Sequence, residues 1–453
     1  MNEDPAQDGV PGEKDPMSEL YRFDGRPPAH STAASALGHL VAMLIGNITP
    51  PMLIASSLGL SASDQAILVQ SALVVAALST ALQLFPVLGF GMGLPCVMGV
   101  SFAYVPILTV IGSEYGIAGI FGAQLASGAI MVLLGFCMVG IRRLFPPIVT
   151  GTVVLAIGIS LYSTAVNYMG GGSSAMVAGT FGSPEFLVLA GITLVVTLGC
   201  GFFGRGIVKV SGMMIGIVVG FVVALFMGDV VDFSDLADAS WLSLPRVFYF
   251  GLEFHPDAIA LLTLINVVEA VQLLGGVSTT ALGAFGREAT AAEIGGSVKA
   301  QGLMCMVGSL FGGLPTCTFN QNVGLICTSK VIARRVFALV AAILLACGLS
   351  PKLSALFTCV PLPVLGGATV TVFAVIAISG IELLCKQPFT YRNKIIVGIS
   401  LALGMGVGSV PEVLQFLPQV AQNVLGSSLA VSFLCVFILN IVVPETEADR
   451  AKE

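Results

Sequence analysis

Long apolar runs separated by short polar stretches fill this chain from residue 33 to residue 443. Since a helix needs about 20 apolar residues to cross the hydrocarbon core of a bilayer, the sequence predicts fourteen membrane spans. They are expected at residues 33–57, 63–84, 90–112, 115–138, 144–166, 185–203, 207–227, 257–280, 292–312, 315–333, 335–349, 353–382, 393–409 and 426–443. With 56% hydrophobic and 10% charged residues, against about 25% charged in soluble domains, the fold class is an all-α polytopic membrane protein. Its expected place is the inner or plasma membrane of a cell, in contact with membrane lipid.

The positions of lysine and arginine test the number of spans. Cytoplasmic loops carry an excess of these residues. If both termini are cytoplasmic, 16 of the 19 Lys and Arg residues fall on that side, whereas the outer loop at 229–239 is acidic. The pattern predicts cytoplasmic tails at residues 1–30, expected to be disordered and free of a signal peptide, and at 444–453. The basic residues form no surface typical of a nucleic-acid partner.

Cysteine and histidine are arranged in a way that argues against a metal site. The ten cysteines are spread singly, without a C-x-x-C pair or a Cys/His cluster. We therefore expect buried free thiols and no metal. An intramembrane enzyme is disfavoured too, because no nucleophile–base pair or Gly-rich phosphate loop is present.

A weak internal repeat relates the two halves of the chain. Leu94-Pro95-Cys96 opens the third span, and Leu314-Pro315-Thr316-Cys317 opens the tenth. Further on, "PPIVTG" at 146–151 and "PLPVLGG" at 361–367 occupy corresponding places. A repeat unit of seven spans must run in the opposite direction in its second copy, which predicts the 7+7 inverted repeat typical of secondary transporters. A chance recurrence of proline in two spans is the alternative.

Spans three and ten are expected to be interrupted. Each has an extended stretch after its proline, followed by a segment that can form a half-helix. Irregular backbone at membrane depth is tolerated only where it is buried in protein or lines a cavity, and a helix N-terminus there offers free N–H groups. We therefore expect Asn320, Gln321 and Asn322 to face a central polar site. A hydrated surface loop is the alternative.

Glu269 lies midway through the span at 257–280. An ionisable residue at that depth is costly and by default marks a functional site, although a structural carboxylate bonded to neighbouring helices would also fit. His39 is either a packed residue or a site residue, and the sequence leaves both open. Ser101 and Phe102 follow the extended part of span three, where a hydroxyl and an aromatic face are able to meet a flat ligand.

The segment "QNVGLICTSKVIAR" at 321–334 resembles the signature of the nucleobase–ascorbate transporter family, roughly Q-N-x-G-x-x-x-x-[ST]-[RK]-V-x-x-R. The matching residues are Gln321, Asn322, Gly324, Ser329, Lys330, Val331 and Arg334. Glu269, 52 residues before Gln321, stands where the family has its substrate-binding glutamate. The resemblance covers about residues 30–443, and "QNVG" is similar to the bacterial xanthine and urate branch.

This resemblance implies a core domain formed by 31–140 and 256–349, and a gate domain formed by 141–255 and 350–443. It also implies a homodimer that imports nucleobases with protons by an elevator-type motion. By position, Glu269 and Gln321 would hold the edge of the base, and Phe102 would stack on its face. Asn320 would offer backbone contacts, and Asn322 and His39 would support the network.

Three positions depart from the family pattern. The family's Gln-His pair in the first span is Gly38-His39 here, and two family aspartates are replaced by Gln301 and Leu273. These changes leave open whether a proton, sodium or no ion drives transport, and no other cofactor is expected. The predicted substrate is a purine nucleobase, xanthine or urate before uracil. The alternatives are a channel-like uniporter of nucleobases and a sulfate or bicarbonate carrier of the same fold, which a central Glu269 disfavours.

Overall fold

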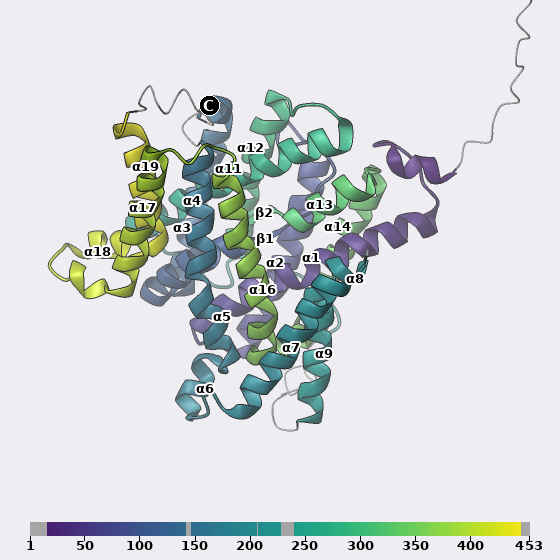
Figure 1. The fold of residues 1–453 in the computed structure, drawn as a ribbon. Helices are drawn as coiled ribbons and strands as arrows, with labels where there is room; N and C mark the ends of the chain where they lie inside the picture. Colours follow the sequence, from purple (N-terminus) through teal and green to yellow (C-terminus); the bar gives the residue numbers. More distant parts are fainter. Residues whose placement is uncertain (1–15, 142–145, 206, 228–239, 445–453) are drawn as a thin grey trace, which may run out of the picture.

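The structure is a computed structural model that describes residues 16–141, 146–205, 207–227 and 240–444. The predicted acidic outer loop and the chain ends at 1–15 and 445–453 lie outside the described residues. Apart from two three-residue strands, the regular structure in these ranges is helical (Figure 1). The prediction of an all-α polytopic protein is therefore confirmed.

The elements of the first half are η1 (Pro16–Tyr21), α1 (Ala29–Ser57), α2 (Ala62–Leu84), β1 (Met98–Val100), η2 (Phe102–Tyr104), α3 (Val105–Ile141), α4 (Pro147–Ser160), α5 (Tyr162–Met169), α6 (Gly172–Ala178), α7 (Pro184–Phe203), α8 (Ile207–Val210) and α9 (Gly212–Phe226). Those of the second half are α11 (Pro256–Phe285), α12 (Ala291–Phe311), β2 (Thr316–Thr318), α13 (Asn320–Ser329), α14 (Arg334–Gly348), α15 (Pro351–Thr358), α16 (Leu362–Leu384), α17 (Tyr391–Ser409), η4 (Pro411–Leu414), α18 (Gln419–Gly426) and α19 (Ser428–Val442).

Each of the fourteen predicted segments contains helix, but not every one is a single long helix. By length and composition, seven described helices are able to cross a membrane, or eight if α14 and α15, bent by 81°, count as one span. Of the remaining described segments, α12 and α17 are continuous helices of 21 and 19 residues, and the others hold shorter helices or, as predicted for spans three and ten, interrupted ones. Gly116, at φ 69°, breaks α3 into two helical parts, close to the predicted boundary between the third and fourth spans. A backbone with positive φ favours glycine, so this residue is suited to the break.

Helices from the two halves of the chain pack together in two groups. In the core group, α3 packs against α11 and α12, and α2 packs against α1 and α14. In the gate group, α16 packs against α4, α5 and α7, α7 packs against α9, and α17 packs against α19. Figure 1 shows the strands inside the core group, with α17 to α19 at one side of the molecule. This intertwining is expected when two copies of an inverted repeat share each domain.

Two predicted boundaries need correction. Residues 16–30 are not a disordered tail, because η1 and the bend after it dock on the loop before α14. The N–H groups of Ile332 and Ala333 donate to the carbonyl of Leu20 in η1 at 3.0 and 3.1 Å, and Leu20 is buried. The predicted span at 353–382 is divided into α15 and α16, and α15 packs against α2 of the core group. Pro361, which precedes α16, lacks the N–H that a continuous helix would use there.

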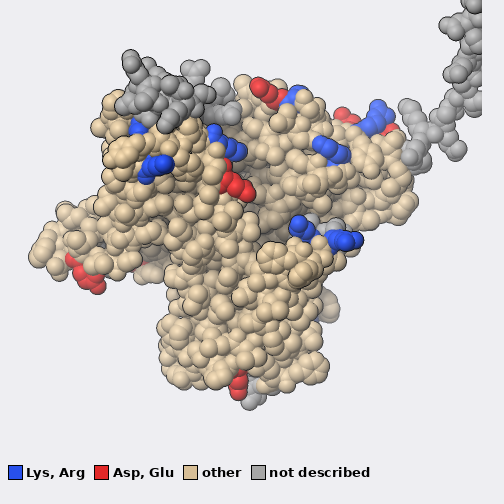
Figure 2. Space-filling model, viewed as in Figure 1, with Lys and Arg blue, Asp and Glu red and all other residues tan. Residues whose placement is uncertain are grey.

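The surface fits a protein surrounded by lipid. On the face shown in Figure 2, most Lys and Arg side chains lie in the upper half of the view, and wide areas have no charged side chain. Many large apolar side chains on the outer helices are exposed, including Phe202 and Phe203 on α7 and Phe226 on α9. In a soluble monomer such apolar area would be unusual.

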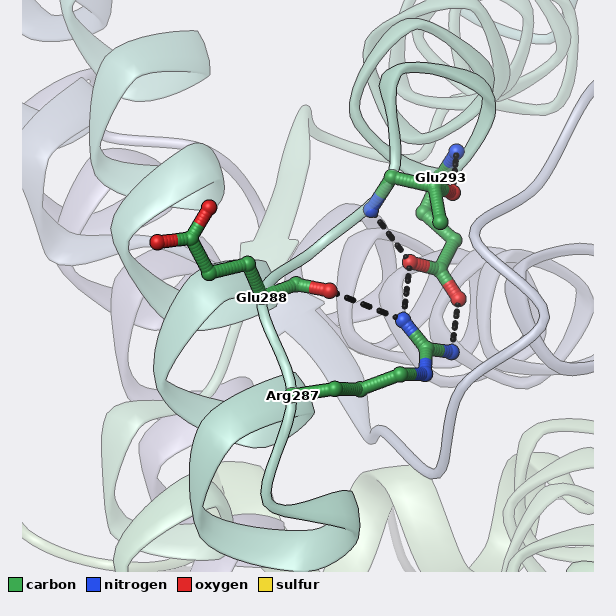
Figure 3. Close-up of polar contacts among 4 residues, drawn as sticks. Arg287, Glu288 and Glu293 are labelled. Atoms are coloured by element: carbon green, nitrogen blue, oxygen red, sulfur yellow. Dashed lines mark hydrogen bonds and ion pairs between the residues drawn. The ribbon is translucent and has the colours of Figure 1, made fainter.

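The loop between α11 and α12 is fixed by charge-assisted hydrogen bonds (Figure 3). Arg287 donates to both carboxylate oxygens of Glu293, at 2.9 and 2.5 Å, and to the Glu288 carbonyl at 3.0 Å. Glu293 also accepts from the N–H of Thr290 at 2.7 Å, which completes a capping box at the start of α12. The capping box satisfies N–H groups that the first turn of a helix leaves without partners.

Candidate functional site

Two short strands, β1 and β2, meet side by side at the centre of the core group, and each leads into a helix. We call this place the strand crossing. β1 and β2 pair antiparallel, with Met98 opposite Thr318 and Val100 opposite Thr316. η2 and α3 follow β1, and α13 follows β2. The two interrupted spans predicted from the sequence are therefore confirmed, and the N-termini of both half-helices begin at this crossing, where their dipoles favour a bound acceptor.

Side chains from neighbouring helices hold the strands in place. The Asn47 Oδ1 atom on α1 accepts from the Val100 N–H at 2.7 Å, and the Thr80 hydroxyl on α2 accepts from the Met98 N–H at 2.9 Å. Asn47 and Thr80 thus accept hydrogen bonds from N–H groups of β1 that the two-stranded sheet itself leaves unpaired. The sequence reasoning missed both. Asn47, a lone amide in an apolar helix just before Pro50 and Pro51, was the available signal.

The Phe319 ring lies in a slot formed by two glycines. A Cβ atom on Gly99 would lie 2.5 Å from the ring, and one on Gly46 would lie 2.7 Å from it. Both distances are well below the ~3.5–4.0 Å of ordinary carbon contacts, so neither position has room for a larger residue. Phe319 precedes Asn320 at the start of α13, and the slot therefore sets the position of the half-helix.

Glu269 is fully buried on α11, facing the crossing strands. The Ser101 hydroxyl and the Cys317 thiol lie close enough to interact with its carboxylate, but neither oxygen has a hydrogen-bond partner of good geometry in the described part of the chain. A buried polar group without a partner costs about 1–3 kcal/mol, and more when it is charged. The structure thus places Ser101 beside Glu269.

Other polar side chains surround this position. The Tyr104 hydroxyl donates to Asn266 Oδ1 at 2.8 Å, and the Asn266 amide donates to the Ser127 hydroxyl at 3.0 Å. Gln301 donates to the Thr316 carbonyl at 3.3 Å, while its own Oε1 is buried without a partner among the described residues. These contacts join α3, α11, α12 and β2 around Glu269.

His39 and Asn322 form a contact between α1 and α13. The Asn322 amide donates to the His39 carbonyl at 2.9 Å and lies 3.2 Å from its Nδ1 atom. His39 also packs against the Phe337 ring, with centroids 4.8 Å apart. Both polar residues are buried, and Asn322 Oδ1 has no partner in the described chain. His39 is therefore a packed residue that positions α13.

A cavity of about 850 Å³ separates core helices α11 and α13 from gate helices α4 and α16. Its lining includes Gln272 and Thr279 on α11, Asn320 on α13, Glu382 on α16, and Lys386 just after the end of α16. Val268 and Val271, which lie on the same face of α11, also line it. The sequence carried no signal for the residues that α16 contributes to this cavity.

The predicted site residues do not all reach this cavity. Asn320 lines it, and Gln321, next to Asn320 at the N-terminus of α13, is exposed. Glu269 is buried behind the lining. Phe102 is buried against Phe373 of α16, with ring centroids 5.4 Å apart in an edge-to-face arrangement, so its ring lies at the boundary between core and gate.

The sequence of this chain matches a known protein family and several of its members. Residues 30–413 match the Permease family. The chain is 36% identical over 418 residues to the uric acid permease PucK of Bacillus subtilis, covering 92% of this chain and 96% of the relative. It is 33% identical over 433 residues to a xanthine permease of the same organism, covering 93% and 98%.

Solved structures share the fold. The transmembrane domain of a cyanobacterium bicarbonate transporter, BicA, matches with a TM-score of 0.53 at 15% identity, over 90% of this chain and 96% of that one. SLC26A9 matches with a TM-score of 0.56 at 14% identity, over 90% of this chain and 65% of that one. At this identity the likeness supports the architecture alone. The relatives agree with the resemblance seen in the sequence, and the chain belongs to the Permease family, as a membrane transporter and not an enzyme.

Proposed function

We propose that this protein imports a nucleobase together with a proton, and that the nucleobase is a purine, xanthine or urate, with uracil as the next candidate. The named activities of its relatives support the substrate class, since two of them are called uric acid permease and xanthine permease. A purine of this kind presents alternating N–H donors and C=O acceptors along its edge. It therefore requires a site that both accepts and donates hydrogen bonds.

The observation that carries the proposal is the environment of the Glu269 carboxylate. Its carboxylate is fully buried, both oxygens lack partners in the described chain, and it lies beside the strands that begin two half-helices. A bound base would supply N–H donors to this acceptor, and a proton would remove the cost of its charge. One side chain would thus couple the two cargoes.

The remaining site residues are assigned by this chemistry. Gln321 accepts and donates along the same edge of the base, and Asn320 offers backbone N–H groups at the start of α13, where no side chain caps the helix. Phe102 stacks on the ring and Ser101 lies beside the carboxylate. His39, Asn322 and Gln301 hold the supporting elements.

The cavity between the two helix groups supports an elevator-type cycle. Its walls come from α11 and α13 on one side and α4 and α16 on the other, so a movement of the core along the gate would close it. It lies at the end of the molecule near Pro146 and Lys386, the end predicted to be cytoplasmic. We propose that the chain has cytoplasmic termini in the cell membrane, and that it works as a homodimer whose contacts are made through exposed apolar helices.

A second candidate is uncoupled nucleobase transport. Gln301 has no ionisable group, and Leu273 is a fully buried apolar residue, so two family carboxylates are missing. The two candidates differ in one property: a symporter accumulates its substrate against a gradient, and a uniporter does not. Sodium in place of the proton would show as dependence of accumulation on external sodium.

The test is xanthine uptake into cells or proteoliposomes by Glu269→Gln. The amide keeps the volume of the side chain and one acceptor but cannot release a proton. We therefore expect uphill accumulation to be lost and the residual flux to become independent of pH between pH 5 and 8. Glu382→Gln is the matched control, because Glu382 also lines the cavity but is exposed on α16; it should keep wild-type coupling. Accumulation by Glu269→Gln at the wild-type rate, with the same pH profile, would show that Glu269 is not the coupling group.

A further inference from the structure

A second, smaller cavity lies at the opposite end of the core–gate boundary. Its volume is about 300 Å³. Its polar lining residues are Ser57 of α1, Thr109 of α3, and Ser163, Thr164, Asn167 and Tyr168 of α5. With cytoplasmic termini, the C-terminal end of α1 and the helix α5 lie on the outer side of the membrane, so this cavity faces the outside.

A closed contact between the two helix groups borders this cavity. The Tyr168 hydroxyl, on the gate helix α5, donates to the Leu53 carbonyl on the core helix α1 at 2.7 Å. Tyr168 is buried, and so are Val105 and Phe102 on the core side. Tyr168 therefore forms the floor of the outer cavity and at the same time joins the two helix groups.

The chemistry of the lining is polar and uncharged. The side-chain amide of Asn167 and the hydroxyl of Thr164 have no hydrogen bond within the described ranges, and Val105 is the single apolar residue of the lining. Ser57 and Ser163 donate to the carbonyls of Ile54 and Ser160, at 2.8 and 3.3 Å. Their oxygens keep lone pairs that can accept.

This set of groups selects a class of ligand. A carboxamide accepts and donates side by side, so it pairs with a ring that has a C=O next to an N–H. Without a charged side chain in the lining, an ion would lose its hydration and gain no opposite charge. An uncharged, planar, hydrogen-bonding heterocycle meets the requirements.

We propose that this cavity is an outer subsite, in which Asn167 holds an oxopurine before the contact between Tyr168 and Leu53 opens. The subsite rests on the proposed function for the identity of its ligand. It is nevertheless a separate binding site, formed by different residues at the other side of a closed contact, and it is occupied without Glu269.

The experiment labels the rim of the subsite. Ser163→Cys places a thiol at an exposed position of the lining, and an impermeant maleimide is added to intact cells with increasing concentrations of xanthine. Wild-type protein labelled in parallel corrects for native thiols such as Cys347, which is partly exposed. We expect xanthine to slow the labelling, and we expect Asn167→Leu in the same background to raise the concentration for half protection about tenfold, as the loss of two hydrogen bonds predicts.

Glu269→Gln in the Ser163→Cys background separates a local ligand from a remote effect. If the subsite binds xanthine itself, protection persists in Glu269→Gln at the same xanthine concentration and needs about tenfold more xanthine in Asn167→Leu. If protection disappears in Glu269→Gln, it reports a conformational change caused by central binding, and the outer subsite is refuted. Unchanged protection in Asn167→Leu also refutes it. Xanthine uptake by the wild-type protein, measured in the same cells, tests the proposed function independently of either result.

Discussion

Gly99→Ala should disturb the candidate site from a distance, through Phe319. The new Cβ atom would lie 2.5 Å from the Phe319 ring and 3.0 Å from Asn47 Oδ1, about 1 Å short of an ordinary carbon contact with the ring. The ring cannot retreat freely, because Gly46 already contacts it from α1 at a position where a Cβ would lie only 2.7 Å away. Overpacking of this kind costs about 1–3 kcal/mol.

The displaced ring would carry the start of α13 with it. We therefore expect Gly99→Ala to lower the thermal unfolding temperature in detergent and to raise the KM for xanthine. Gly199→Ala on α7 is the matched control: nothing lies within 4 Å of its added Cβ, and alanine is the better helix former by up to about 1 kcal/mol. Phe319→Leu combined with Gly99→Ala should recover part of the lost stability, because the smaller side chain leaves room for the methyl group. If Gly99→Ala were as stable and as active as Gly199→Ala, the slot would not set the position of α13.

Gln321→Glu should change which bases compete for uptake, because the carboxylate replaces an N–H donor by an acceptor and changes the binding free energy by about 1–3 kcal/mol. If oxopurines and aminopurines inhibited the variant in the same order as the wild type, Gln321 would be excluded from the site. Phe23→Ala should make the N-terminal segment more sensitive to protease, since its ring packs 4.3 Å below the Arg334 guanidinium; Arg22→Ala, with 63% of its side chain exposed, is the control and should cleave at the wild-type rate. Arg287→Ala should cost under about 1 kcal/mol, because the Arg287 side chain lies at the surface, 43% exposed, where ion pairs contribute little. A large fall in unfolding temperature would contradict this.

The interrupted spans were predictable from the sequence because proline and polar amides are rare at membrane depth. Pro95 and Pro315 each precede an extended stretch, and both stretches form strands in the structure. The break at Gly116 agrees with the boundary expected between two spans. In each case a local residue property, a missing N–H group or a tolerance for positive φ, determines the backbone without help from the rest of the fold.

What the sequence could not predict depends on tertiary contacts. Nothing in the local pattern shows that Leu20 is buried on the loop before α14, since its partners lie more than 300 residues away. Likewise, the apolar residues continue from α15 into α16, so the sequence pattern does not show that the helix ends at Thr358 and that a new one begins at Leu362. The ring of Phe102, a core residue, packs against the ring of Phe373, a gate residue. A contact between residues so far apart in the chain cannot be predicted from the sequence pattern.

The same tertiary contacts explain how the fold tolerates a carboxylate at its centre. Buried polar atoms without partners are rare in native proteins, yet among the described residues Glu269 has two, and Gln301 and Asn322 have one each. All three lie on elements that meet at the strand crossing or at the start of α13, while the amides of Gln301 and Asn322 are anchored by their other atoms. The anchored amides of Gln301 and Asn322 fix the elements around Glu269, so that under the proposed function a base that donates hydrogen bonds would meet the Glu269 carboxylate already in position, with little side-chain entropy to overcome. The cost of leaving the carboxylate oxygens unpaired would then be carried by the folded protein in advance, and it would be released when the base binds.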